Sequence, residues 1–190
     1  NVDAHSYYDH AFGIDVYDYG DHSTTIVDNS GSVNATSDNY IAIGIYVETP
    51  GYAADNIIYN SGTATATGLA AAGIAGVAFG DYGSVSIYND GTAAAYASYD
   101  LARAYGIVAL AEYAYVSNNG SAYAYAYGDT ASATGIKITG YTADLVTGAD
   151  SYTGAVAIGY DLAIAEGAAV LGVYATASLD GAMNASATAD

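Results

Sequence analysis

Few residues of this chain are suited to acid–base or nucleophilic catalysis. The three histidines, His5, His10 and His22, all lie in the first part of the sequence, and the chain has no cysteine. A Ser–His–Asp or Cys–His arrangement needs a nucleophile beside a base that a third group orients, and this sequence offers little material for one. We interpret the histidines as polar surface residues and assign no catalytic residue.

The acidic residues could attract cations. Asp and Glu together number 20, and hard carboxylate oxygens suit Ca²⁺. The chain contains neither an EF-hand loop nor the Gly-Gly-x-Gly-x-Asp repeats with which calcium β-rolls bind the ion. We therefore expect weak or diffuse Ca²⁺ binding and assign no metal ligand and no cofactor-binding residue.

The charge balance excludes several partners. The 190 residues include 2 Lys or Arg against 20 Asp or Glu, for a formal net charge of −18. With so few cations we expect no nucleic-acid binding and no attraction to anionic membranes. No run of about 18 apolar residues occurs, so we also expect no membrane insertion. A hydrophobic fraction of 53% predicts a folded chain rather than an acidic tail.

A repeat of about 30 residues organises the chain. Its marker, apolar-x-Asn-x-Gly, ends at Gly31, Gly62, Gly91 and Gly120, and weaker copies end at Asp150 and Gly181. The markers divide the chain into a single array of repeats, namely 1–31, 32–62, 63–91, 92–120, 121–150 and 151–181, with a partial repeat at 182–190. Because such a repeat is too short to be a domain, its copies must pack on one another.

Within each repeat, apolar and polar residues alternate, as in a strand with one buried side. The residue four positions before the marker end is apolar and is expected to face the core: Val27, Ile58, Ile87, Val116, Val146 and Ala177. After the marker, small apolar residues fill the second and fourth positions. The first position holds hydroxyl residues, which are expected to face outwards: Ser32, Thr63, Thr92, Ser121 and Ser151.

A second motif, Ala-x-Gly-Ile-x-Val, lies half a repeat earlier. It occurs at 11–16, 42–47, 104–109 and 133–138, with a blurred copy near Gly73. The alanine and the isoleucine are an odd number of residues apart. Both can therefore face the core only if the glycine between them breaks the alternation, as a bulge or corner does.

These patterns predict an all-β fold, a parallel β-helix (β-solenoid) of about six turns, each of three short strands. Stacked turns pair every backbone N–H and C=O with the turn above or below, and alanine fills a narrow interior. Equivalent residues then form columns, among them an amide ladder or, alternatively, a polar binding strip: Asn29, Asn60, Asn89 and Asn118.

Two further columns concern charge and aromaticity. The residue before the marker end runs Ser30, Ser61, Asp90, Asn119, Ala149 and Asp180, so two neutral turns separate the carboxylates. Tyr59 and Tyr88 share one column, and Tyr96 and Tyr125 share another. For the tyrosines we consider structural ladders, self-association, and a contact surface for a glycan or a receptor.

The Asn-Ser-Gly marker, the alternating Ala and Thr, and the Ala-x-Gly-Ile-x-Val motif resemble the β-helical passenger regions of Gram-negative autotransporters and related secreted adhesins. The resemblance covers nearly all of the chain. It implies export, an extracellular or bacterial cell-surface location, and a role in adhesion, aggregation or biofilm formation.

We therefore predict a non-enzymatic, extracellular structural or adhesive β-solenoid. It is expected to be a segment of a surface adhesin or a protomer that self-assembles end to end into a fibre, because residues 1–6 begin in mid-turn and residues 184–187 remain in phase without a cap. Expected partners are further copies or neighbouring repeats, and also glycans or cell-surface receptors.

The alternative is a β-helix carbohydrate-active enzyme, a polysaccharide lyase or hydrolase acting on extracellular glycans. Paired carboxylates hydrolyse glycosidic bonds, but among 20 acidic residues some pair lies at a suitable distance by chance. Lyases of the pectin-degrading β-helix kind use an arginine base beside acidic calcium ligands. The two basic residues here, Arg103 and Lys137, lie on different turns in alanine-rich strands.

Overall fold

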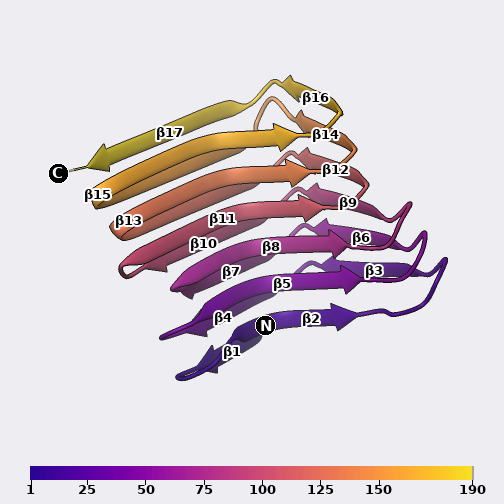
Figure 1. The fold of residues 1–190 in the computed structure, drawn as a ribbon, viewed down its shortest axis with the longest axis horizontal. Helices are drawn as coiled ribbons and strands as arrows, with labels where there is room; N and C mark the ends of the chain where they lie inside the picture. Colours follow the sequence, from indigo (N-terminus) through magenta and orange to yellow (C-terminus); the bar gives the residue numbers. More distant parts are fainter. Residues whose placement is uncertain (190) are drawn as a thin grey trace.

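The computed structural model describes residues 1–189 and shows an all-β solenoid of parallel strands (Figure 1). Seventeen strands wind through about six turns, each of about 30 residues, and no helix occurs in this range. The predicted fold class is confirmed. Asp190, the last residue of the expected partial repeat, lies outside the described residues.

Each turn crosses three faces in order. The first face contains β1 (Val2–Ser6), β4 (Ser32–Ser37), β7 (Thr63–Gly68), β10 (Thr92–Ser98), the first halves of β13 (Ser121–Thr139) and β15 (Tyr152–Leu171), and β17 (Ala182–Ala189). The second face contains β2 (Ala11–Tyr17), β5 (Ile41–Thr49), β8 (Ala70–Ala78), β11 (Leu101–Leu110) and the second halves of β13 and β15. The third face contains β3 (Thr24–Asn29), β6 (Asp55–Asn60), β9 (Ser84–Asn89), β12 (Tyr113–Asn118), β14 (Thr142–Thr147) and β16 (Tyr174–Leu179).

The strands of each face stack in parallel register. The first and second faces form one 11-stranded sheet because β13 and β15 run continuously around the corner between them, and the third face is a six-stranded sheet. The expected mid-turn start is confirmed, since Val2 pairs with Val33 and Ser6 with Ser37. Leu101 pairs with Thr130, which in turn pairs with Leu162, so residues two turns apart lie in one column.

The interior contains two clusters of different composition. Alanine alone fills the corner where the first and second faces meet, and a larger cluster of Ile, Val, Leu and Ala fills the rest. On β5, Ala42 belongs to the alanine cluster whereas Ile45 and Val47 belong to the larger one. All three side chains are buried, so the break in alternation predicted at the motif glycine is confirmed.

Close stacking explains two of the glycines. A Cβ added at Gly44 would lie 2.6 Å from the carbonyl oxygen of Gly73 on the next turn. A Cβ added at Gly62 would collide with the carbonyl oxygen of Gly31 on the turn before. In both places the backbones of successive turns approach so closely that any side chain would force them apart.

The predicted asparagine ladder is present and buried. Asn29 Nδ2 donates to Asn60 Oδ1, Asn60 Nδ2 to Asn89 Oδ1, and Asn89 Nδ2 to Asn118 Oδ1, each at 2.7 Å. Asn60 also donates to the carbonyl oxygen of Thr92 at 3.2 Å. These amides satisfy one another inside the stack, which favours the structural interpretation of this column over a binding strip.

Two positions predicted from the markers near residue 150 are wrong. Leu145, not Val146, pairs with Val116 and is buried, whereas Val146 is 39% exposed. Tyr152, not Ser151, continues the column of Ser121. The reason is the turn length, since two residues separate β12 from β13 but four separate β14 from β15.

The acidic column is also shifted there. Gly148, not Ala149, follows Asn119 in the column, because the Gly148 N–H donates to the carbonyl oxygen of Asn118. The column still places neutral residues between Asp90 and Asp180, and Asn119 Nδ2 donates to Asp90 Oδ1 at 2.9 Å. The predicted spacing of the two carboxylates is therefore retained.

Asn60→Asp tests the ladder. Asn60 is 1% exposed, and an aspartate there would lose both donated hydrogen bonds and place a charge among amides. We expect a loss of about 3 kcal/mol in the free energy of unfolding at pH 7, measured by urea denaturation. Because burial raises the pKa of an aspartate, the loss should shrink as the pH falls towards 4.

The exposed variant Asp90→Asn is the control and should change stability by less than about 0.5 kcal/mol. An Asn60→Asp protein as stable as the wild type at pH 7 would contradict a structural role for the ladder.

Candidate contact surfaces

The three histidines lie on separate elements. His5 is on β1 with its Nε2 3.2 Å from Asp38 Oδ1, and His10 precedes β2 with its Nδ1 2.9 Å from Asp9 Oδ1. His22 lies in the turn before β3, where its ring meets Tyr52 edge-on at 5.4 Å. All three are exposed, and their side chains contact different neighbours rather than one shared site.

The two basic residues lie on the same face. Arg103 is on β11 and Lys137 on β13, and both belong to the outward-facing rows of the second face. Lys137 Nζ lies 5.4 Å from the ring centroid of Tyr105, a cation–π contact between adjacent turns. The chain has no further Lys or Arg, so its whole fixed positive side-chain charge is on this one face.

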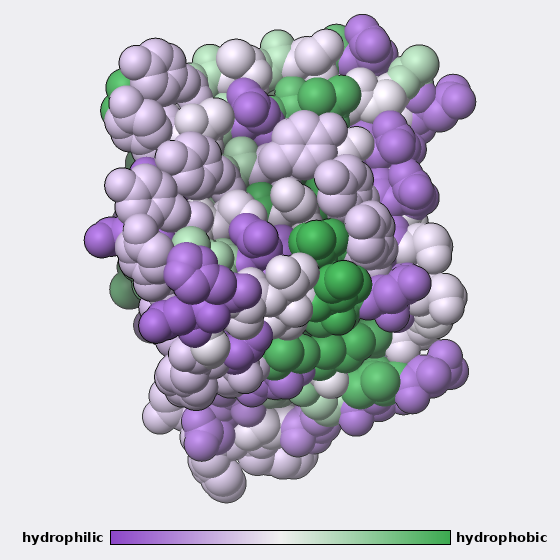
Figure 2. Space-filling model, turned by 90° about the vertical axis from the view of Figure 1, so that its right-hand side faces the viewer, coloured by the Kyte–Doolittle hydropathy of each residue, from purple (hydrophilic) through white to green (hydrophobic). Residues whose placement is uncertain are grey.

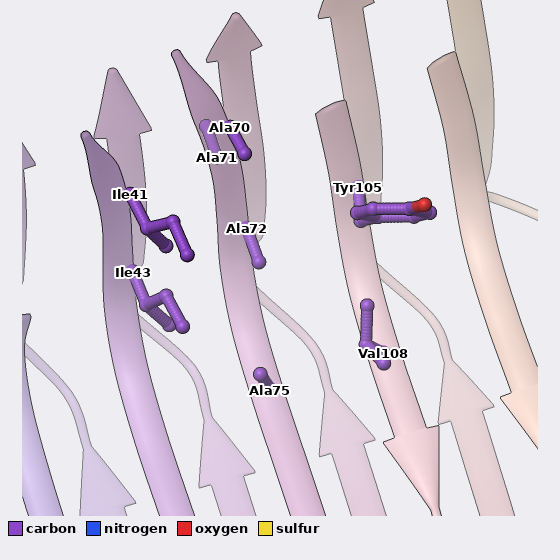
Figure 3. A pocket seen from close by; sticks show the side chains of 8 residues that line it. All are labelled: Ile41, Ile43, Ala70, Ala71, Ala72, Ala75, Tyr105 and Val108. Atoms are coloured by element: carbon purple, nitrogen blue, oxygen red, sulfur yellow. The ribbon is translucent and has the colours of Figure 1, made fainter. Parts of the chain in front are cut away.

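In its middle, on β5, β8 and β11, the second face carries apolar side chains on its outside as well as its inside. Ile41 and Ile43 of β5 stand on one side of β8, and Tyr105 and Val108 of β11 stand on the other (Figure 3). Between them β8 presents only alanine methyl groups, from Ala70, Ala72 and Ala75. The result is a groove of about 230 Å³ one strand wide, floored by β8.

A second hollow continues from the first. It has a volume of about 350 Å³. Its lining includes Tyr105, Val108 and Leu110 of β11, and Lys137 and Thr139 of β13 on the next turn. The columns around the marker did not predict this face. The sequence does contain a signal for this apolar face. The x positions of the Ala-x-Gly-Ile-x-Val motif hold Phe, Ile, Tyr and Val in several copies.

Aromatic rings and carboxylates gather at the N-terminal end of the second face. Tyr46 contacts Phe12 at 5.5 Å and Tyr17 at 5.7 Å between ring centroids, and its hydroxyl donates to Glu48. Burial, together with that bond, raises the pKa of Tyr46 far above the ordinary value. Burial and the nearby Glu48 charge also raise the pKa of Asp15, which pairs with Tyr46 across the ladder.

Tyrosine columns run along the outside of the solenoid. Tyr59 and Tyr88 stack at 5.1 Å with 16° between their ring planes, as their shared column predicted. Tyr96 pairs in register with Tyr125, also as predicted, but its ring meets the diagonal neighbour Tyr123 at 6.1 Å. Further ring contacts between turns join the following pairs: Tyr52 and Tyr82, Tyr88 and Tyr115, Tyr123 and Tyr152, Tyr127 and Tyr160, and Tyr141 and Tyr174.

Aromatic and hydrophobic side chains lie together on one side of the molecule (Figure 2). Figure 2 shows aromatic rings gathered along the left margin, with hydrophobic side chains exposed beside paler and strongly hydrophilic groups. Among residues 1–189 the structure contains no group of three or more His, Asp or Glu arranged to hold a metal ion. The described part of the chain also contains no helix that is long and apolar enough to cross a membrane.

Comparisons with protein-family models, with curated proteins and with solved structures gave no match for this chain. Its functional surfaces are therefore inferred from its own residues.

Asp15→Asn tests the electrostatics of the aromatic end. Because the folded state raises the pKa of Asp15, it binds this proton more readily than the unfolded chain does. Binding of this proton therefore stabilises the folded state below the ordinary aspartate pKa. That stabilisation is lost as the pH rises through the higher pKa of the folded state. We expect Asp15→Asn to be more stable than the wild type at pH 7 by about 0.5 kcal/mol.

The same urea titrations at pH 3.5 should show a smaller difference, because lowering the pH favours the protonated form of Asp15 in the wild type. Asp28→Asn, at an exposed carboxylate on β3, is the matched control and should change stability little at either pH. A destabilised Asp15→Asn protein at pH 7 would contradict the unfavourable partial desolvation assigned to this carboxylate.

Proposed function

We propose that this protein is an extracellular structural β-solenoid that mediates adhesion through its exposed tyrosine columns. The observation that supports this role is the contact between outward-facing tyrosines on successive turns, as between the exposed Tyr59 and the half-buried Tyr88. The resemblance to secreted adhesins supports surface display, and the absence of cysteine means that stability does not depend on the redox state of the compartment.

Tyrosine columns suit adhesion for a physical reason. Each ring offers a large amphipathic contact area, and the ladder beneath it fixes the backbone position. Rings that already contact one another, such as Tyr141 and Tyr174 at 5.3 Å, have fewer side-chain conformations to lose on binding. A repeating sugar chain or a protein surface could therefore contact several rings at once, and weak contacts would add up.

The net charge supports the same role. A formal charge of −18 favours hydration of the solenoid and opposes non-specific association. It also attracts cations diffusely, which would let divalent ions modulate attachment to other acidic surfaces.

Fluorescently labelled protein applied to glycan arrays and to intact cells tests this proposal. The double variant Tyr59→Ser, Tyr88→Ser removes the best-stacked pair and should weaken binding at least tenfold, because two aromatic contact surfaces are lost. Tyr99→Ser, at an exposed tyrosine outside these columns, should bind as the wild type does.

Urea denaturation of each variant shows whether the fold is retained. Unchanged binding by a folded double variant would reject the tyrosine columns as the adhesive surface. Cleavage of the arrayed polysaccharides, instead of binding, would support the carbohydrate-active enzyme and reject the adhesive function.

A further inference from the structure

We propose that the second face is a lateral interface between two copies of this chain. The copies are related by a two-fold axis that runs parallel to the strands and passes between β8 and β11. This operation lays β8 of each copy on β11 of the other and β5 of each copy on β13 of the other. The pairing is independent of the adhesive role, since it uses a different face.

The groove and its neighbouring ridge are complementary under this symmetry. The groove is floored by Ala72 and Ala75 of β8, and the ridge one turn further on is formed by Tyr105 and Val108 of β11. β8 and β11 lie on adjacent turns, and the two-fold axis passes between them. The axis therefore places the ridge on β11 of each copy over the groove on β8 of the other. The apolar contact is thereby formed twice, as an isologous interface requires.

Register supports the fit at the level of single residues. Ala72 pairs with Tyr105 and Ala75 with Val108 across the ladder, so each alanine lies at the same position along its strand as the larger side chain beside it. An axis parallel to the strands preserves these positions. Tyr105 of the second copy therefore faces Ala72, and Val108 of the second copy faces Ala75.

The distribution of charge favours a second copy of this chain as the partner that covers the second face. Two chains of −18 repel one another, but the second face holds both basic side chains, Arg103 and Lys137. The same axis sets Lys137 of one copy opposite Tyr46 of the other, beside the carboxylates of Asp15 and Glu48. Lys137 would thus offset two acidic groups that lack a basic partner within the described chain.

The dimensions are sufficient for a stable dimer. Six strands about 4.8 Å apart and about eight residues per strand at 3.3 Å each give a face of about 750 Å² per copy. Specific interfaces bury about 800 Å² per partner. The apolar part of this face lies on β5, β8 and β11, and the outward residues of the flanking β13 are polar: Thr130, Ser132, Thr134, Lys137 and Thr139. An apolar centre with a polar rim is the usual composition of a specific interface.

Sedimentation equilibrium of the intact chain tests the proposal. The chain has a mass of 19.1 kDa, and we expect the wild type to show twice that mass at micromolar concentration. Ala72→Asp places a charge on the floor of the groove and should raise the dimer dissociation constant at least tenfold. A wild type that stays monomeric at 100 µM would overturn the proposal.

A matched control uses another outward alanine. Ala94 lies on the first face and is 4% exposed, compared with 7% for Ala72. Ala94→Asp should dimerise like the wild type, and circular dichroism should show the same β spectrum for both variants. Oligomers larger than two that persist in Ala72→Asp would assign association to another surface and overturn the proposal.

Charge exchange tests the symmetry itself. Lys137→Glu and Glu48→Lys should each weaken the dimer, because like charges then face each other across the axis. An equimolar mixture of the two variants pairs opposite charges at both contacts and should recover association to within about threefold of the wild type. A mixture that remains monomeric would overturn the stated arrangement.

Discussion

The in-register stacking of parallel strands is the constraint on which the rest of this structure depends. Successive turns lie one strand spacing apart, about 4.8 Å, on all three faces. At that distance a side chain at Gly62 is not tolerated, whereas the amides of Asn29 and Asn60 reach each other at 2.7 Å. Glycine, asparagine and tyrosine therefore recur in columns because one spacing determines what each column accepts.

The same constraint fixes what lies inside. Each turn has a narrow corner and a wider region, and the kink at the motif glycine separates them. Ala42 enters the corner, where only a methyl group fits, while Ile45 three residues later enters the wider cluster. The high alanine content of the chain follows from this geometry, since every turn must fill the same corner with the smallest apolar side chain.

The outside is organised by face rather than by a single pocket. The first and third faces carry hydroxyls and many of the stacked tyrosines, and the second face carries apolar side chains with both basic residues. A solenoid repeats each position at every turn, so a functional surface on it is a row of equivalent residues. Adhesion through tyrosines and pairing through the second face use two such rows without interfering.

The sequence by itself determined the repeat, the parallel stack, the asparagine ladder and the inward rows, because each depends on residue types that recur at a fixed interval. It did not determine that Leu145 replaces Val146 in the core, since the longer turn before β15 shifts the phase there. Only the tertiary structure decided that Ile43, Ala72 and Tyr105 form a groove wall, floor and ridge. That arrangement arises between neighbouring turns, where side chains about 30 residues apart meet, and no single repeat contains it.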